Sequence, residues 1–268
     1  MSRKCAYPES NLNVAQRLFD GYSTVMSETS LANLLEDVSA YRHPMGSCRD
    51  AINQIILADY PNETTIKANF IDQVLISQNP STVSIFELPI GSSRVDICKI
   101  NGHSAAYEIK TDLDTFSRLE GQLHDYFDVF ESVYVITSDS RWSDLPDYVP
   151  DECGIYSYRK RNDGSYCFCA RRRATRSKAF DSEKQLYVMP KTAITSAFDV
   201  SAGKLSKNEL IHLVLANYGM RAINAAFKKY LKERYEPNWS RFRALHPDIF
   251  EIDYEWFYRN GLDPSIIY

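Results

Sequence analysis

The spacing of apolar and polar positions along the chain predicts an α/β protein. Apolar residues recur three or four positions apart within residues 1–45, 49–60 and 65–77, which is the spacing of a helix with one buried face. The period then changes to the alternation typical of strands, with turn residues such as Asn101-Gly102 between the segments. Strands are expected at 82–90, 94–100, 105–110 and 132–137.

The second half of the chain continues the alternation of helices and strands. Residues 113–130 carry an apolar stripe and predict an amphipathic helix. The nearly all-apolar run 132–137 suits a central strand that is buried on both faces. A hairpin is expected at 154–158 and 166–170, and helices at 210–235 and 239–258. We therefore divide the chain into an N-terminal helical segment (1–45), an α/β core (46–180) and a C-terminal helical region (181–268).

Composition adds few constraints. The hydrophobic fraction of 44% and the charged fraction of 25% are ordinary for a globular protein and exclude collagen-like or disordered classes. No apolar run approaches the ~20 residues of a membrane span, and the first residues lack the apolar core of a signal peptide. A cytoplasmic protein with no membrane partner is expected. The six cysteines form no CxxC pair and are expected to be reduced thiols.

Candidate chemistry lies at Asp96, Glu108 and Lys110. Residues two apart on a strand share a face, so Glu108 and Lys110 lie side by side while Tyr107 and Ile109 face the core. Asp96 lies between Val95 and Ile97 on the preceding strand and is expected on the same non-core face. The alternative is a solvated hairpin in which surface ion pairs join Glu108 to Lys110 and Asp96 to Arg94.

The pairing register of this hairpin tests the proposed site more strictly than the sequence Glu108-Ile109-Lys110 does. A two-residue turn at Asn101-Gly102 would place Asp96 opposite Tyr107, so that core residues and site residues would share one face of the sheet. A three-residue loop that includes His103, or an equivalent bulge, places Asp96 opposite Glu108. Facing carboxylates repel each other unless a cation lies near them. A hard divalent ion such as Mg²⁺ or Mn²⁺, which prefers oxygen ligands, would neutralise both.

The next helix continues the pattern. Arg118, Gln122 and Tyr126 are four apart and share one edge of the helix, although Tyr126 alone would suit a helix core. The succession Glu87-Leu, Arg94-Val-Asp96, Tyr107-Glu108-Ile-Lys110, Gln122-x-x-x-Tyr126 resembles the PD-(D/E)xK nuclease superfamily. It is similar to a bacterial and phage-associated subgroup with a RecB-like QxxxY helix. The proline that often precedes the first acid is missing here.

The resemblance implies a restriction-endonuclease-like core, in which a mixed central sheet is flanked by helices, with helical N- and C-terminal additions. It implies that Asp96, Glu108 and the carbonyl of Ile109 bind Mg²⁺ or Mn²⁺, and that Lys110 assists the attacking water. It makes Gln122 and Tyr126 supporting catalytic residues. Glu87 is our candidate for an additional metal-binding acid, although many superfamily members place that acid on the preceding helix.

These features predict a metal-dependent nuclease whose partner is nucleic acid, with DNA favoured over RNA. An RNA-cleaving toxin-like enzyme is the first alternative, with Tyr156, Tyr158, Tyr166 and Phe168 as stacking residues. A catalytically silent binding or assembly module is the second, and a homodimer remains open. Basic residues concentrated between 159 and 178 are expected to hold the phosphate backbone. They are Arg159, Lys160, Arg161, Arg171, Arg172, Arg173, Arg176 and Lys178.

Overall fold

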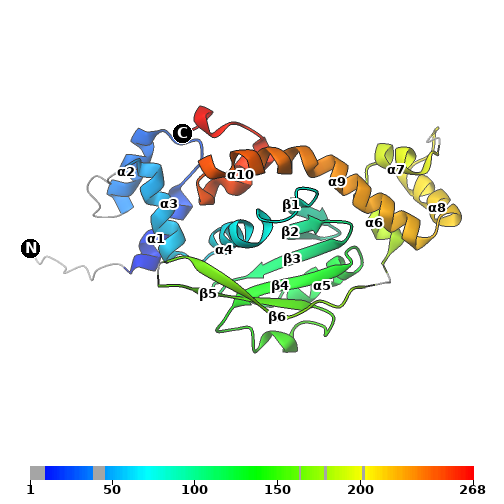
Figure 1. The fold of residues 1–268 in the computed structure, drawn as a ribbon, viewed down its shortest axis with the longest axis horizontal. Helices are drawn as coiled ribbons and strands as arrows, with labels where there is room; N and C mark the ends of the chain where they lie inside the picture. Colours follow the sequence, from blue (N-terminus) through cyan, green and yellow to red (C-terminus); the bar gives the residue numbers. More distant parts are fainter. Residues whose placement is uncertain (1–9, 39–45, 163, 178–179, 201–202) are drawn as a thin grey trace, which may run out of the picture.

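A six-stranded mixed sheet with strand order β1-β2-β3-β4-β5-β6 lies at the centre of the protein (Figure 1). The computed structural model describes residues 10–38, 46–162, 164–177, 180–200 and 203–268. The β1-β2-β3 and β5-β6 pairs are antiparallel, and β4 is parallel to both β3 and β5. The expected α/β class, the meander and the later hairpin are confirmed. The strands are β1 (Val83–Ile90), β2 (Ser93–Ile100), β3 (Ser104–Lys110), β4 (Ser132–Ser138), β5 (Gly154–Lys160) and β6 (Tyr166–Arg172).

The β2–β3 hairpin has the register expected from its apolar pattern. Ile97 opposes Tyr107 and Ile100 opposes Ser104, so a three-residue loop joins the strands, as predicted. The expectation of an open, non-core face is wrong, because β3 is buried at every position. Helices cover both faces of this strand, and therefore Glu108 and Lys110 are buried rather than solvated.

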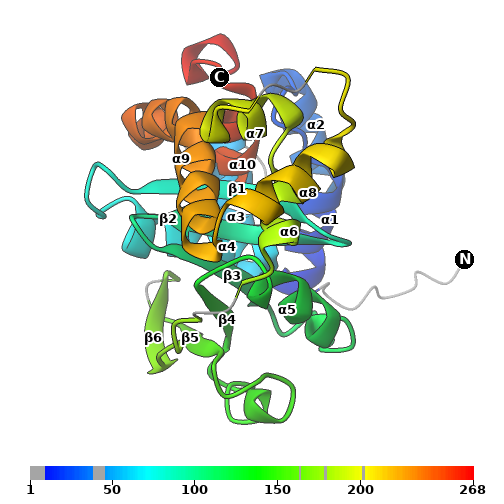
Figure 2. The same ribbon diagram turned by 90° about the vertical axis from the view of Figure 1, so that its right-hand side faces the viewer.

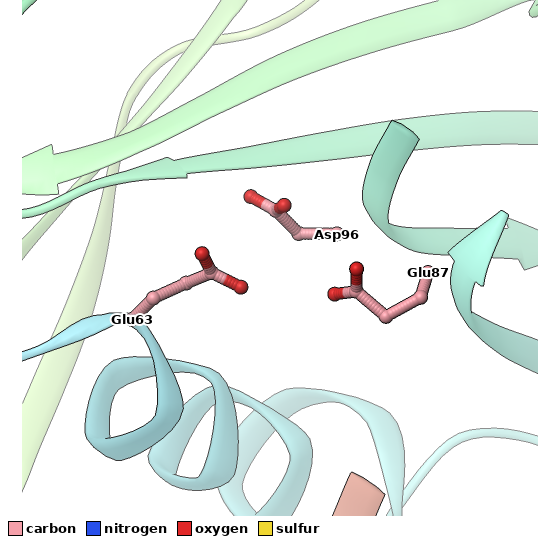
Figure 3. Close-up of side chains that lie close together, drawn as sticks. All are labelled: Glu63, Glu87 and Asp96. Carbon is pink, nitrogen blue, oxygen red and sulfur yellow. The ribbon is translucent and has the colours of Figure 1, made fainter. Parts of the chain in front are cut away.

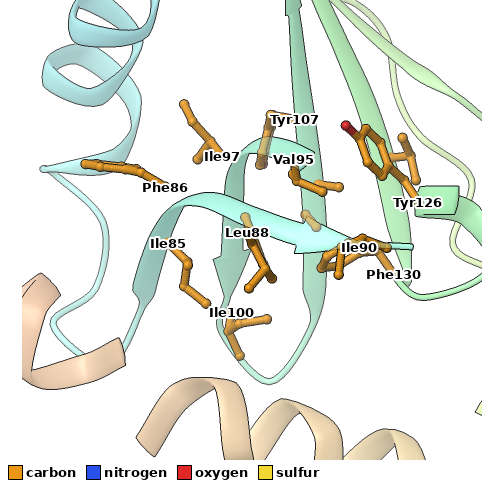
Figure 4. Packing of buried hydrophobic residues seen from close by; sticks show 14 of the residues in the cluster. Ile85, Phe86, Leu88, Ile90, Val95, Ile97, Ile100, Tyr107, Tyr126 and Phe130 are labelled. Carbon is orange, nitrogen blue, oxygen red and sulfur yellow. The ribbon is translucent and has the colours of Figure 1, made fainter. Parts of the chain in front are cut away.

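Two helices pack on opposite faces of β3. The ring of Phe70, at the end of α4 (Glu63–Phe70), lies 5.3 Å from the ring of Tyr107. The neighbouring residue on the strand, Glu108, accepts a hydrogen bond from Tyr126 of α5 (Leu119–Phe127). Successive side chains of a strand point to opposite faces, so α4 and α5 enclose the sheet between them. Figure 4 shows the apolar side chains of this core.

The predicted helix at 113–130 is wrong at its start, because α5 begins only at Leu119. Asp114 Oδ2 accepts hydrogen bonds of 2.8 Å from both the backbone N–H and the hydroxyl of Thr111. Such local side-chain bonds offer the backbone an alternative to helix. Leu113, which was placed in the apolar stripe, is half exposed. The predicted helix at 65–77 also divides, since a π-helical turn (Ile71–Leu75) follows α4.

Three N-terminal helices form a second apolar cluster. Their bounds are α1 (Asn11–Gly21), α2 (Glu28–Val38) and α3 (Cys48–Asp59). The buried members of the cluster come from all three helices: Leu18, Leu31, Leu35, Ile52 and Ile56. Arg49 of α3 joins this unit to the C-terminal part through Asp253, at 3.6 Å. Figure 1 shows these helices beside α10 at one end of the molecule.

The C-terminal helices differ from the prediction in where they begin and end. A break was expected near Pro237, yet α9 runs from Met220 to Leu245 with Pro237 inside it. The chain instead breaks between α8 and α9, where Gly219 caps α9. None of the helices that the structure describes is both long and apolar enough to cross a membrane. The remaining helices are α6 (Ser182–Val188), α7 (Lys191–Phe198), α8 (Lys207–Asn217) and α10 (Tyr254–Asn260), with short 3₁₀ turns at Leu145–Asp147, His246–Asp248, Glu251–Asp253 and Pro264–Ile266.

The long helix α9 runs along the β1 side of the sheet (Figures 1 and 2). Phe227 in its first half packs against Phe130, which follows α5. Trp239 and Phe242 in its second half pack edge-on against Phe86 of β1. Both halves are therefore part of the main core.

The cysteines that the structure describes are all free thiols, as expected. Burial raises the pKa of the Cys98 and Cys153 thiols, so these two groups stay protonated and behave as small apolar residues. Cys5 lies outside the described residues.

Glu131 is a buried ionic hub between the sheet and α9. Its side chain accepts hydrogen bonds from the Ser104 backbone N–H (2.7 Å) and from Lys228 Nζ (3.1 Å). Arg176 Nη2 lies 2.5 Å away on another side. Against the cost of burial, the hydrogen bonds from Arg176, Ser104 and Lys228 lower the pKa of Glu131 to about 2. The loop before β4 is thereby tied to the N-terminus of β3, to α9 and to the segment after β6.

Glu131→Gln should destabilise the protein by about 2 kcal/mol at neutral pH, because charge-assisted hydrogen bonds are lost. A depressed folded-state pKa contributes stability that is present above the unfolded value and lost as pH falls through the folded value. For Glu131 this interval runs from 4.5 down to about 2. Urea unfolding across the acid range should show a steeper loss for wild type than for Glu131→Gln. The exposed Glu152→Gln is the control, and equal slopes in all three proteins would contradict the assignment.

Candidate active site

Asp96 and Glu108 come together where the β2–β3 ladder ends. The last paired residues are Ile97 and Tyr107, and the next residue on each strand is the acid. Asp96 Oδ2 accepts a hydrogen bond of 2.6 Å from the backbone N–H of Ile109, so a side chain replaces the missing ladder bond. Asp96 is 7% exposed and Glu108 is 1% exposed. The structure thus brings together the two acids that the sequence placed in register.

The two carboxylates lie in an unfavourable electrostatic environment. Burial, followed by the charges of Glu108 and Glu63, raises the pKa of Asp96 well above its usual range. Burial also raises the pKa of Glu108, against the opposing effects of Lys110 and the Tyr126 hydroxyl. Groups held this far from their preferred ionisation are frequent at functional sites.

Lys110 and Tyr126 hold Glu108 from two sides. Lys110 Nζ donates to Glu108 Oε1 at 2.5 Å. The Tyr126 hydroxyl lies 2.8 Å from Glu108 Oε2 and 2.7 Å from the carbonyl oxygen of Arg94. The tyrosine is fully buried, so it is both a core aromatic and a positioning residue for the carboxylate.

Gln122 borders a cleft beside Asp96. The cleft has a volume of about 670 Å³. Among the residues that the structure describes, the buried Gln122 Oε1 has no hydrogen-bond partner. Such an atom needs a water or a ligand, since a buried acceptor without one is costly. The cleft is lined by Glu87, Pro89, Ser92, Ser93, Arg94, Asp96, Ser117, Arg118, Gly121 and Gln122.

A second acidic group shares Asp96. Carboxylate oxygens of Glu63, Glu87 and Asp96 all lie within 4.8 Å of one another, and Figure 3 shows the three side chains pointing toward a common centre. Glu87, the tentative extra ligand, therefore groups with Asp96 and Glu63, and this group does not include Glu108. Glu63 was missed in the sequence. Its signal was Asn62, whose side chain caps α4 and is followed directly by this acid in the first turn of the helix.

The backbone of Glu87 has a strained conformation at the point where its side chain joins Glu63 and Asp96. Its φ of 56° is left-handed, a conformation that costs a non-glycine residue of order 1 kcal/mol. The flanking pairs Phe86–Ile97 and Leu88–Val95 keep a single register on either side. Glu87 therefore faces Asp96 across the ladder without being paired to it.

The basic stretch lies apart from these acids, on β5, β6 and the segment that follows, and β3 and β4 separate it from β2. Several members are already bonded: Arg171 Nη2 lies 2.8 Å from Asp139, Arg172 donates to the carbonyl of Cys153, and Arg176 pairs with Glu131. The exposed members are Arg159, Lys160, Arg161, Arg171, Arg173 and Arg176; Lys178 lies outside the described residues. Phosphate binding by this stretch stays a prediction.

The aromatic residues considered for base stacking belong to the core instead. Tyr158 and Tyr166 are buried. The rings of Tyr156 and Phe168 pack edge-on against Phe70 of α4, with centroids 5.8 and 5.1 Å away. Base stacking is excluded for the buried Tyr158 and Tyr166, and for the partly exposed Tyr156 and Phe168 it stays a prediction beside strand packing.

The chain belongs to the family described as "Bacteriophage P4 protein cII", whose model matches residues 57–248. It is 32% identical over 71 residues to Protein cII of Enterobacteria phage P4, and this match covers 26% of the chain and 27% of that protein. The chain thus matches about a quarter of that relative's length. The matched family region includes α4, the whole sheet and all of α9.

Among solved structures, the chain overlaps the SPO1766 protein of unknown function from Silicibacter pomeroyi. The TM-score is 0.31 at 16% sequence identity, over 52% of this chain and 85% of the other. An overlap this weak supports no assignment of fold or function.

Asp96→Asn should stabilise the metal-free protein by about 1 kcal/mol at neutral pH. An acid with a raised folded-state pKa binds more protons when folded, so stability falls as pH rises from the unfolded value toward the folded one. Asparagine removes that penalty while its Oδ1 can still accept from Ile109. Thermal unfolding in EDTA measures the effect against the exposed Asp147→Asn. A variant less stable than wild type would show that the ionised Asp96 does not destabilise the folded protein.

Tyr126→Phe should lower the free energy of unfolding by about 1 kcal/mol, because Glu108 Oε2 and the Arg94 carbonyl lose their shared donor. Urea unfolding is the measurement, and Tyr148→Phe, at an exposed ring, is the matched control. If both variants match wild type, the hydroxyl does not hold the carboxylate.

Proposed function

We propose that this chain is a metal-dependent nuclease with a PD-(D/E)xK site on a restriction-endonuclease-like core, and that it hydrolyses phosphodiester bonds in DNA. The observation that carries the proposal is the buried Asp96–Glu108 pair with Lys110 on the same strand. The order of elements supports it as well: helix α4, an antiparallel meander, the connecting helix α5 and a parallel strand β4. Asp96 also lines an open cleft that a substrate can enter.

The residues at the site suit a hard divalent cation such as Mg²⁺ or Mn²⁺. Both acids offer oxygen ligands, and burial raises the pKa of each, so a nearby cation would favour their ionised forms. The Gln122 Oε1 adds a polar atom that lacks a partner within the described residues. When bound, such an ion would lower the pKa of a water ligand and stabilise charge on phosphate. Asp96, Glu108 and the Ile109 carbonyl are its proposed ligands.

The remaining side chains have distinct proposed roles. Lys110 lies against Glu108 and orients the attacking water or neutralises charge that develops on phosphate. Tyr126 positions Glu108. Arg94, whose side chain is 62% exposed, and Arg118 border the cleft and suit phosphate oxygens, since guanidinium groups bind them in a bidentate way.

Asp96→Asn and Lys110→Met should each lower the cleavage rate roughly a hundredfold or more, because each removes a group that acts on the reacting atoms. The assay incubates plasmid DNA, linear DNA and tRNA with each protein in Mg²⁺ or Mn²⁺. We expect cleavage of DNA by wild type, and none in EDTA.

The matched controls are Asp147→Asn and Lys99→Met, which make the same changes of charge away from the cleft and should keep wild-type rates. Cleavage of tRNA alone would favour the RNA enzyme. Equal behaviour of wild type and Asp96→Asn on every substrate would refute the proposal and leave a silent binding module.

A further inference from the structure

A buried lysine contacts two of the three acids of the second acidic group. Lys67 of α4 is 4% exposed, and its Nζ lies 2.8 Å from Glu63 Oε1 and 3.3 Å from Glu255 Oε2. It also contacts Glu87 Oε1. These partners come from α4 itself, from β1 and from α10, so segments distant in sequence converge on one ammonium group.

Carboxylates surround the Lys67 ammonium on several sides. Its three partners, Glu63, Glu87 and Glu255, each offer a carboxylate oxygen to Nζ. An isolated buried charge would be very unfavourable, whereas one surrounded by opposite charges is tolerated. The contacts of Lys67 thus suit a cation at this position.

The same position has the spacing of a divalent-cation site. The oxygens of Glu63, Glu87 and Asp96 lie within 4.8 Å of one another, and two of these acids, Glu63 and Glu87, contact the Lys67 ammonium. A metal ion and an ammonium group cannot share the space beside these oxygens, because like charges a few ångströms apart repel strongly away from bulk water. Either the lysine moves or no ion binds there.

We propose that the Lys67 ammonium takes the place of a second divalent cation beside Asp96. Asp96 then has a metal ion toward Glu108 on one side and a fixed lysine charge toward Glu63 and Glu87 on the other. The metal half of this arrangement rests on the proposed function, whereas the lysine half rests on the contacts of Lys67. Lys67 acts through Glu63 and Glu87, which it contacts, and is a positioning residue.

The test is the stoichiometry of Mn²⁺ binding to the full chain, measured by electron paramagnetic resonance and calorimetry. Wild type should bind one ion. Lys67→Met should gain a second ion, or bind the first at least roughly tenfold more tightly, because three carboxylates lose their cation. Lys99→Met is the control: it removes a half-buried lysine of β2 that lies over the Tyr107 ring, and it should match wild type.

Glu63→Gln supplies a second measurement if Lys67→Met fails to fold. The Glu63 side chain is 48% exposed, so this variant retains the core. If Glu63 is only an ion-pair partner of Lys67, the Mn²⁺ affinity of Glu63→Gln should stay within roughly twofold of wild type. A loss of roughly tenfold or more would make Glu63 a metal ligand and overturn the proposal.

The outcomes separate this inference from the proposed function. Two ions in wild type would overturn the inference and leave the nuclease proposal intact. No ion in wild type but one in Lys67→Met would support the lysine as the occupant and contradict the Asp96–Glu108 metal site. Unchanged binding in Lys67→Met, including none in either protein, would overturn the inference.

Discussion

The balance of charge around Asp96 is the constraint on which the rest of the site depends. Two ammonium groups, those of Lys67 and Lys110, lie among five acids: Glu63, Glu87, Asp96, Glu108 and Glu255. Two guanidinium groups add positive charge, since Arg94 pairs with Glu87 and Arg259 pairs with Glu255. The fold keeps these acids close although their repulsion opposes folding. Natural proteins retain such unfavourable arrangements mainly where function needs them. The cost of ionisation falls on Asp96 and Glu108, whose pKa values are raised first of all by burial, and this local cost is the feature that motivates the proposed cation site.

Part of this site could be predicted because the burial of apolar residues and the pairing of the acids require the same strand register. A register that buries Val95 with Ile109 also places Asp96 beside Glu108, so the apolar pattern located the acids. The alternation of β1 to β3 and the all-apolar β4 are local signals of the same kind. They remain visible without any knowledge of distant contacts.

The parts that escaped prediction depend on distant contacts or on local competition. Glu63 and Lys67 are four apart on a helix, the usual spacing of a solvated ion pair, and only Glu87 and the C-terminal Glu255 turn that pair into a buried cluster. The start of α5 was missed because Asp114 and Thr111 hydrogen-bond to each other in a turn. The break in the C-terminal helices was placed at Pro237, whereas α9 accommodates that proline.

A protein that carries its own cation in the acidic cluster does not need a metal to complete its fold. The Lys67 contacts join α4, β1 and α10 by covalently attached charge, so the chain can reach its native arrangement before any ion arrives. Under the proposed function, a divalent ion would then add to a site whose charge the chain has already partly balanced.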